Sequence, residues 1–221
     1  MKKATEGRNL PAGGFSSWLR NTRRAQKTKK GADVPCGDCT ACCTSSYFIH
    51  IRPDEADTLA RIPKKLVFPA PGLPKGHVLL GYGADGHCPM FIGGKCSIYA
   101  HRPQACRDYD CRIFPATGLS PGEDKPIISR QVERWKFDLA QSRDREHIAA
   151  VRAAARFLRE HANRFPARFV PAHPTQVAMV AIKIYEVFLG LDKASEKGEA
   201  GTPVSEVVRA VMAAYQRGNN N

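Results

Sequence analysis

The sequence lacks the features that mark several large classes of protein. Among its 221 residues, no apolar run reaches the roughly 20 residues that a membrane-spanning helix needs. The longest run, residues 177–189, is interrupted by Lys183 and Glu186. The chain also lacks a secretory signal, a phosphate-binding glycine loop and the G-x-S-x-G motif of serine hydrolases. We therefore expect a cytoplasmic protein without a membrane span, and the sequence leaves open whether it is an enzyme.

Acidic residues are scarce near the N-terminus. Residues 1–31 contain nine Lys or Arg residues and a single acidic residue, Glu6, in a chain whose net charge is +13. Basic segments of this kind bind nucleic acid or other anionic surfaces in some proteins. Because sustained apolar periodicity is missing here, we expect residues 1–33 to form a disordered basic tail. Any contact of residues 1–31 with nucleic acid or an anionic surface should be weak.

The remaining sequence predicts an α+β fold that is mainly α-helical. Strand-forming residues and the Gly93-Gly94 pair predict strands at 46–52 and 77–82 and a hairpin at 91–99. Apolar residues at helical spacing predict helices at residues 52–62, 129–141, 145–165, 175–191 and 204–217. We therefore expect a small Cys-rich metal-binding module with short strands at residues 34–127. A helical region at residues 128–221 should follow it and pack on the module.

All eight cysteines fall in two tight groups. The first group reads C-x2-C-x2-C-C, and the second has irregular spacing. In order, the cysteines are Cys36, Cys39, Cys42 and Cys43, then Cys88, Cys96, Cys106 and Cys111. Thiolates are preferred ligands of zinc and of iron–sulfur clusters, so we predict that all eight are metal ligands. The irregular spacing of the second group further predicts that the two groups converge in space.

The sequence leaves two kinds of metal centre open. A C-x2-C-x2-C run with a distant fourth cysteine is similar to the run that holds a four-iron cluster in bacterial ferredoxins. Zinc sites more often use two separated C-x2-C pairs. The adjacent Cys42 and Cys43 could serve two different centres, because neighbouring side chains normally diverge. The expected cofactor is therefore a [4Fe–4S] cluster or zinc, or one of each.

A longer pattern carries a resemblance to a known family. Residues 86–111 read G-x-C-P-M-F, then G-x-C-x-I-Y-x-x-R-P-x-x-C-R-x-Y-x-C, and they follow the first cysteine group. Over residues 34–112 this resembles the bacterial CxxCxxCC family, for which zinc or iron chelation is the suggested function. The resemblance implies a metal-chelating protein in which the centre has a structural or redox role.

Two other functions stay open beside metal chelation. One branch of the family, the flagellin lysine methylases, shares the cysteine cluster, so a related cluster-dependent enzyme that modifies proteins is the first alternative. The second alternative is a basic zinc module that binds nucleic acid through residues 1–31. Nucleic-acid binding would favour basic and aromatic residues interleaved on a folded platform, whereas here the charge is concentrated in one terminal segment.

Three residues of the family pattern are candidates for cofactor binding. Arg102 and Arg107 flank the third cysteine of the second group, and their guanidinium groups could offset thiolate charge or bind an anionic substrate. Tyr109 could donate a hydrogen bond to a cluster sulfur. The alternatives are an ion pair of an arginine with Asp108 or Asp110, and a packing role for the tyrosine.

Overall fold

The computed structural model of the chain describes residues 9–28, 31–32, 34, 38–167, 169–190 and 202–219. Its contacts define two compact units. The cysteine unit comprises Thr28–Asp110 and Asp124–Gln131, and the helical unit comprises Met1–Lys27, Cys111–Glu123 and Val132–Asn221. The chain therefore enters each unit more than once, whereas the sequence predicted consecutive segments with boundaries after residues 33 and 127. Helices predominate and the strands are short, so the predicted mainly helical α+β class is confirmed. No helix in the described ranges is long and apolar enough to cross a membrane.

Short elements make up the cysteine unit. In chain order they are η1 (Ala41–Thr44), β2 (Ile49–Ile51), α2 (Ala56–Leu59), η2 (Lys64–Leu66), β3 (Val67–Pro69), β4 (Val78–Leu80), β5 (Phe91–Ile92), β6 (Lys95–Cys96), η3 (Tyr99–His101) and α3 (Gln104–Asp108). Helix α5 (Pro126–Arg134) has residues in both units. The predicted strands and hairpin are present, whereas the predicted helix at 52–62 is only one turn long.

A three-stranded antiparallel sheet covers the small core of the cysteine unit. The strand order is β2–β4–β3, and Leu80 of the central strand lies between Ile49 and Val67. Residues that pair directly across neighbouring strands point to the same face, so Ile49, Leu80 and Val67 share the inner face of the sheet. Pro69 lies on the edge strand β3, where its missing N–H is tolerated. The buried core residues are Ile51, Ile62, Leu80, Met90 and Ile98.

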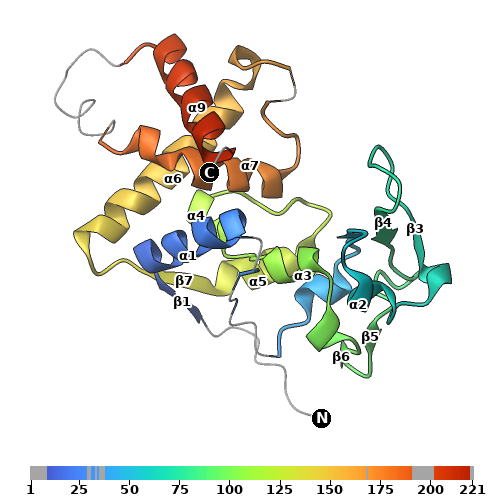
Figure 1. Cartoon of the computed structure of the whole chain (residues 1–221). Coiled ribbons are helices and arrows are strands. Elements are labelled where there is room, and N and C mark those ends of the chain that lie inside the picture. Colours follow the sequence, from blue (N-terminus) through green and yellow to red (C-terminus); the bar gives the residue numbers. More distant parts are fainter. Residues whose placement is uncertain are drawn as a thin grey trace. The chain divides into compact units, whose positions relative to one another are not determined.

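The elements of the helical unit come from distant parts of the chain. They are β1 (Leu10–Gly14), α1 (Phe15–Thr28), α4 (Ile113–Thr117), β7 (Trp135–Asp138), α6 (Ser142–Glu160), η4 (Ala162–Arg164), α7 (Pro174–Ile184), η5 (Tyr185–Phe188) and α9 (Val204–Asn219). Helix α7 packs against both α6 and α9, and α4 packs against α6 and α7 (Figure 1). The helices predicted in the last third of the chain are confirmed.

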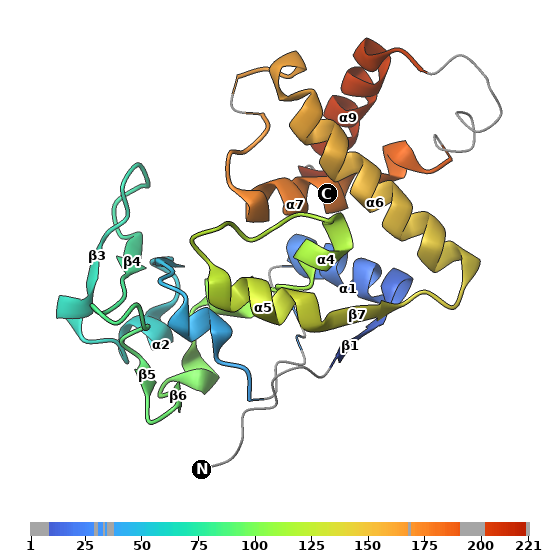
Figure 2. The same ribbon diagram turned by 180° about the vertical axis from the view of Figure 1, so that it is seen from behind.

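The predicted disordered tail is wrong over residues 10–28. Strand β1 runs parallel to β7, with Leu10 paired to Trp135 (Figure 2). Helix α1 buries Phe15, Trp18 and Leu19, which share one helix face because they are three and four residues apart. The four basic residues of this segment, Arg20, Arg23, Arg24 and Lys27, therefore lie on a folded helix. The other residues of the predicted tail, apart from those at 9, 31 and 32, lie outside the described ranges.

Residues 135–138 also differ from the prediction, which extended a helix from 129 to 141. Helix α5 ends at Arg134, and the chain continues as strand β7. The ring of Phe137 lies 5.0 Å from that of Phe15 and 4.9 Å from that of Trp18, measured between centroids. Pairing with β1 and these aromatic contacts explain why the segment is extended, and neither is visible in the local sequence.

Asp144 links the first turn of α6 to the start of α1. Its Oδ1 accepts a hydrogen bond from the main-chain N–H of Ser16 at 2.8 Å, and hydrogen bonding by Ser16 lowers the pKa of the carboxyl below its ordinary value. A lowered pKa in the folded state stabilises the fold above the ordinary Asp value of about 4, and this contribution is lost as the pH falls through the lowered pKa.

We therefore expect acidification from about pH 5 to pH 3 to destabilise the native chain more than the Asp144→Asn variant. The measurement is the thermal midpoint by circular dichroism at each pH. Asp57→Asn, at an exposed position of α2, is the control and should keep the native acid sensitivity. Identical pH profiles for the native chain and Asp144→Asn would contradict the stabilising role assigned to the Asp144 carboxylate.

Candidate metal centre

Main-chain hydrogen bonds join the two cysteine groups. The N–H of Cys88 donates to the carbonyl of Cys43 at 2.8 Å, although 45 positions separate them in sequence. The N–H of Phe91 donates to the carbonyl of Cys88, and the β5–β6 hairpin pairs Phe91 with Cys96. The hairpin reverses at Gly93-Gly94, where both glycines have positive φ (60° and 77°) as a two-residue turn requires. These contacts bring Cys43 of the first group beside Cys88 and the hairpin of the second group, while a shared metal centre stays a prediction.

The thiols of Cys43, Cys88 and Cys96 interact electrostatically with that of Cys106. Burial is the largest cause that raises the pKa of Cys106 to about 12, and Cys88, Cys43 and Cys96 act in the same direction. Burial, with a smaller contribution from Cys96, also raises the pKa of Cys88. Burial therefore disfavours the thiolate form of both Cys88 and Cys106. Because a metal binds the thiolate form, metal binding at these residues would release protons.

The donor set fits zinc or iron chemically, but the thiols do not form a closed site. No three Cys, His, Asp or Glu side chains within the described ranges are arranged so that they could hold a metal ion. The described cysteines are reduced, and Cys42 is exposed whereas Cys39 is partly buried. Cys36 lies outside the described residues.

Cys111 belongs to the helical unit. Its buried Sγ accepts a hydrogen bond from the indole Nε1 of Trp135 at 3.2 Å. The guanidinium of Arg112 lies 5.8 Å from the Trp135 ring and donates to the carbonyl of Ala12 at 3.2 Å. These contacts make Cys111 part of the packed interior of the helical unit. Its role as a metal ligand stays a prediction.

Arg102 acts electrostatically on the third cysteine of the second group. Its positive charge lowers the pKa of Cys106, against the larger effect of burial. The guanidinium stacks over Tyr99 at 4.2 Å from the ring centroid and donates to the Tyr99 carbonyl at 2.9 Å. These two contacts hold the cation in position. Its function in cofactor binding stays a prediction.

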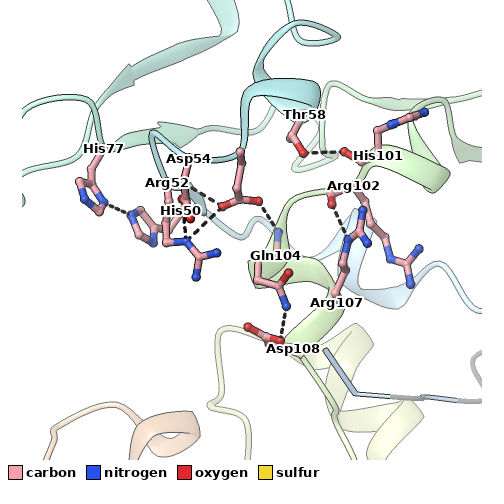
Figure 3. Close-up of polar contacts among 11 residues, drawn as sticks. His50, Arg52, Asp54, Thr58, His77, His101, Arg102, Gln104, Arg107 and Asp108 are labelled. Carbon is pink, nitrogen blue, oxygen red and sulfur yellow. Dashed lines mark hydrogen bonds and ion pairs between the residues drawn. The ribbon is translucent and has the colours of Figure 1, made fainter. Parts of the chain in front are cut away.

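Arg107 fastens the turn that precedes α3. It donates from Nε to the carbonyl of Arg102 at 3.0 Å (Figure 3) and from Nη2 to that of Ala100 at 3.1 Å. The expected alternative was an ion pair with a neighbouring aspartate, but Asp108 instead accepts a hydrogen bond from Gln104 at 2.7 Å. Arg107 therefore helps to fix the segment that carries Cys106.

Tyr109 connects the two cysteine segments. Its hydroxyl lies 3.2 Å from that of Tyr47, which follows the first group, and the ring centroids are 5.6 Å apart. Lys125 lies 5.0 Å from the centroid of the Tyr47 ring and donates to the carbonyl of Ser46. The geometry shows a packing and hydrogen-bonding role for Tyr109, while cofactor binding stays a prediction.

Glu55 is a structural residue of the site that the sequence did not reveal. Its Oε2 accepts a hydrogen bond from the N–H of Gln104 at 2.6 Å, and its Oε1 accepts one from the N–H of Arg52 at 2.9 Å. The hydroxyl of Thr58 donates to the carbonyl of His101 at 2.8 Å (Figure 3). Helix α2 is thus tied to the start of α3, and these bonds position Cys106. Nothing in the spacing of an isolated glutamate signals this role.

We expect Glu55→Gln to destabilise the cysteine unit by about 1–3 kcal/mol, because a charged hydrogen-bond acceptor with only 10% of its side chain exposed is replaced. Urea unfolding followed by circular dichroism measures the change. Asp54→Asn is the matched control, since its side chain is 69% exposed and should change stability by less than about 0.5 kcal/mol. Equal effects of the two substitutions would contradict this assignment.

Comparison with known families supports the metal-binding interpretation. Residues 35–136 match the family model CxxCxxCC, described as "Putative zinc- or iron-chelating domain". The match contains all eight cysteines and confirms the resemblance inferred from the sequence. Comparisons with curated proteins and with solved structures find no match.

Proposed function

We propose that this zinc- or iron-chelating domain binds a metal centre through the thiolates of Cys43, Cys88, Cys96 and Cys106. The observation that carries the proposal is the main-chain hydrogen bond from Cys88 to Cys43, beside the β5–β6 hairpin that carries Cys96. The electrostatic interaction of these three thiols with Cys106 supports it. Four thiolates are the complete ligand set of a structural zinc ion and of a [4Fe–4S] cluster. The other cysteines of the predicted set remain candidates for additional ligands.

The proposed role of the centre is structural. The strands of the cysteine unit are two or three residues long, and its core is small. Such a unit buries little apolar surface, and small domains of this kind commonly depend on a metal. A centre held by η1, the β5–β6 hairpin and α3 would cross-link the three segments that carry the ligands. Arg102 would offset part of the negative charge of the thiolates.

Single Cys→Ser substitutions test the ligand set. Substitution of Cys88, Cys96 or Cys106 in anaerobically purified full-length protein should abolish the metal bound at this centre, measured by elemental analysis per chain. Cys111→Ser is the comparison variant, because serine can still accept the hydrogen bond from Trp135; it should retain that metal. Metal retained at this centre in Cys106→Ser, or metal lost equally from Cys106→Ser and Cys111→Ser, would contradict the four-thiolate assignment.

A further inference from the structure

Three arginines of α6 line a cavity in the helical unit. Arg152, Arg156 and Arg159 are four and then three residues apart, so they share one face of the helix. The cavity has a volume of about 540 Å³. Its other lining residues are Thr117, Gly118, Leu119 and Glu160. The lining thus combines three guanidinium groups with a single carboxylate.

Among the residues that the structure describes, two of these arginines have no protein partner for their charge. Arg152 donates a hydrogen bond to the carbonyl of Pro115 at 3.0 Å. Across the described ranges, Arg156 and Arg159 form neither an ion pair nor a side-chain hydrogen bond, and both are exposed. Like charges three or four residues apart on a helix destabilise it by a few tenths of a kcal/mol per pair. Glu160, four residues after Arg156, offsets part of this repulsion, and a bound anion would offset the rest.

The end of α4 faces these arginines. Gly118 terminates the helix in the left-handed conformation, with φ of 71°, and its N–H donates to the carbonyl of Phe114 at 2.8 Å. The Cγ of Arg152 lies 3.9 Å from the position that a Cβ of residue 118 would occupy. The chain reversal at Gly118 therefore places Thr117 and Leu119 in the cavity lining beside the arginines. The Thr117 hydroxyl donates to the carbonyl of Ile113 at 2.7 Å, so the hydrogen-bond donors for an anion are the guanidinium groups.

We propose that this cavity binds the phosphate group of a small phosphorylated molecule. Three guanidinium groups and one carboxylate leave two positive charges in excess, which complements a phosphate monoester dianion. The planar guanidinium offers paired N–H donors that match phosphate oxygens, and such charge-assisted bonds are strong. The volume lies within the range of small-molecule sites, which leaves space for an organic group beyond the phosphate. This site is separate from the cysteines and does not depend on metal binding.

The test uses inorganic phosphate and pyrophosphate as probes with the full-length chain. Isothermal titration calorimetry should show saturable binding of at least one probe to the native chain. Binding should also raise the thermal midpoint relative to chloride at matched ionic strength. The double substitution R156Q/R159Q should weaken binding at least about tenfold, because it removes two charge-assisted contacts. Its ligand-free thermal midpoint should equal or exceed the native value, since like-charge repulsion is removed.

The matched control is Arg143→Gln, at an exposed position of α6 outside the cavity lining. Its affinity should stay within about twofold of the native value, because surface charges far from a site act weakly. The absence of saturable binding of both probes to the native chain would overturn the proposal. Equal affinity of the native chain, the control and R156Q/R159Q would also overturn it.

Discussion

Deletion of residues 1–31 is expected to unfold the helical unit. The deletion removes strand β1, the partner of β7, and the buried side chains of Phe15, Trp18 and Leu19. Burial of each large apolar side chain contributes about 1.5–3 kcal/mol, and the total stability of a domain is only about 5–15 kcal/mol. The truncated chain should therefore lose its cooperative thermal transition in the helical region, measured by circular dichroism and hydrogen exchange.

A point substitution separates this packing effect from the loss of charge. Trp18→Ala should cost about 3–5 kcal/mol, because Trp18 is 4% exposed and packs against Phe15 and Phe137. Arg20→Gln, at an exposed position of the same helix, should change stability by less than about 0.5 kcal/mol. A truncated chain with the native thermal midpoint would show that α1 is not part of the core.

Removal of the metal is expected to unfold the cysteine unit while the helical unit remains folded. Metal binding to thiolates that are not assembled in the unfolded chain contributes directly to folding, by about 10 kcal/mol or more in small zinc domains. The helical unit has its own buried face, because α6 and α7 bury most of their apolar residues. Chelation should therefore abolish the protection of main-chain amides from hydrogen exchange in β2 and β4. The protection of the amides in α6 and α7 should stay largely unchanged.

Hydrogen exchange followed by mass spectrometry measures both regions in one experiment. The comparison is between the protein as purified and the same protein after chelation, both under anaerobic conditions. Restored protection of β2 and β4 after the metal is returned would show that chelation did not damage the chain. Equal loss of protection in the two units, or no loss in either, would contradict a structural role confined to the cysteine unit.

Local patterns in the sequence predicted the elements that depend on local interactions. The helices that became α6, α7 and α9 follow from their apolar spacing, and the turn at Gly93-Gly94 follows from the positive φ that both positions require. The convergence of the cysteine groups followed from the irregular spacing of the second group. These predictions needed no information on which distant segments pair.

The errors arose where distant residues determine the structure. Helix α1 carries an apolar stripe at Phe15, Trp18 and Leu19, but the surrounding basic residues favoured a disordered tail over a buried helix. Strand β1 has the sequence LPAGG, which lacks alternation, and it forms only because β7 lies beside it. The role of Glu55 likewise depends on the position of the N–H of Gln104, 49 residues away.

At the candidate sites too, the local sequence shows which residues are present, whereas their arrangement depends on distant segments. The arginine face of α6 is visible in the sequence as residues at positions 152, 156 and 159, but the cavity exists only because the end of α4 lies opposite them. For the cysteines, composition indicated the chemistry, whereas the proposed set of four ligands depends on how the fold brings Cys43 beside Cys88. Cys111 shows the limit of composition, because its sulfur accepts a hydrogen bond from Trp135 within the helical unit.

The most direct test of the account is the metal and thiol content of full-length protein purified under anaerobic conditions. Elemental and acid-labile sulfide analysis gives the metal per chain, and a thiol reagent counts accessible cysteines before and after chelation. We predict bound zinc, or iron with sulfide, and the appearance of the thiols of Cys43, Cys88, Cys96 and Cys106 when the metal is removed. Folded protein without metal, or metal removal that exposes none of these four thiols, would contradict the central claim.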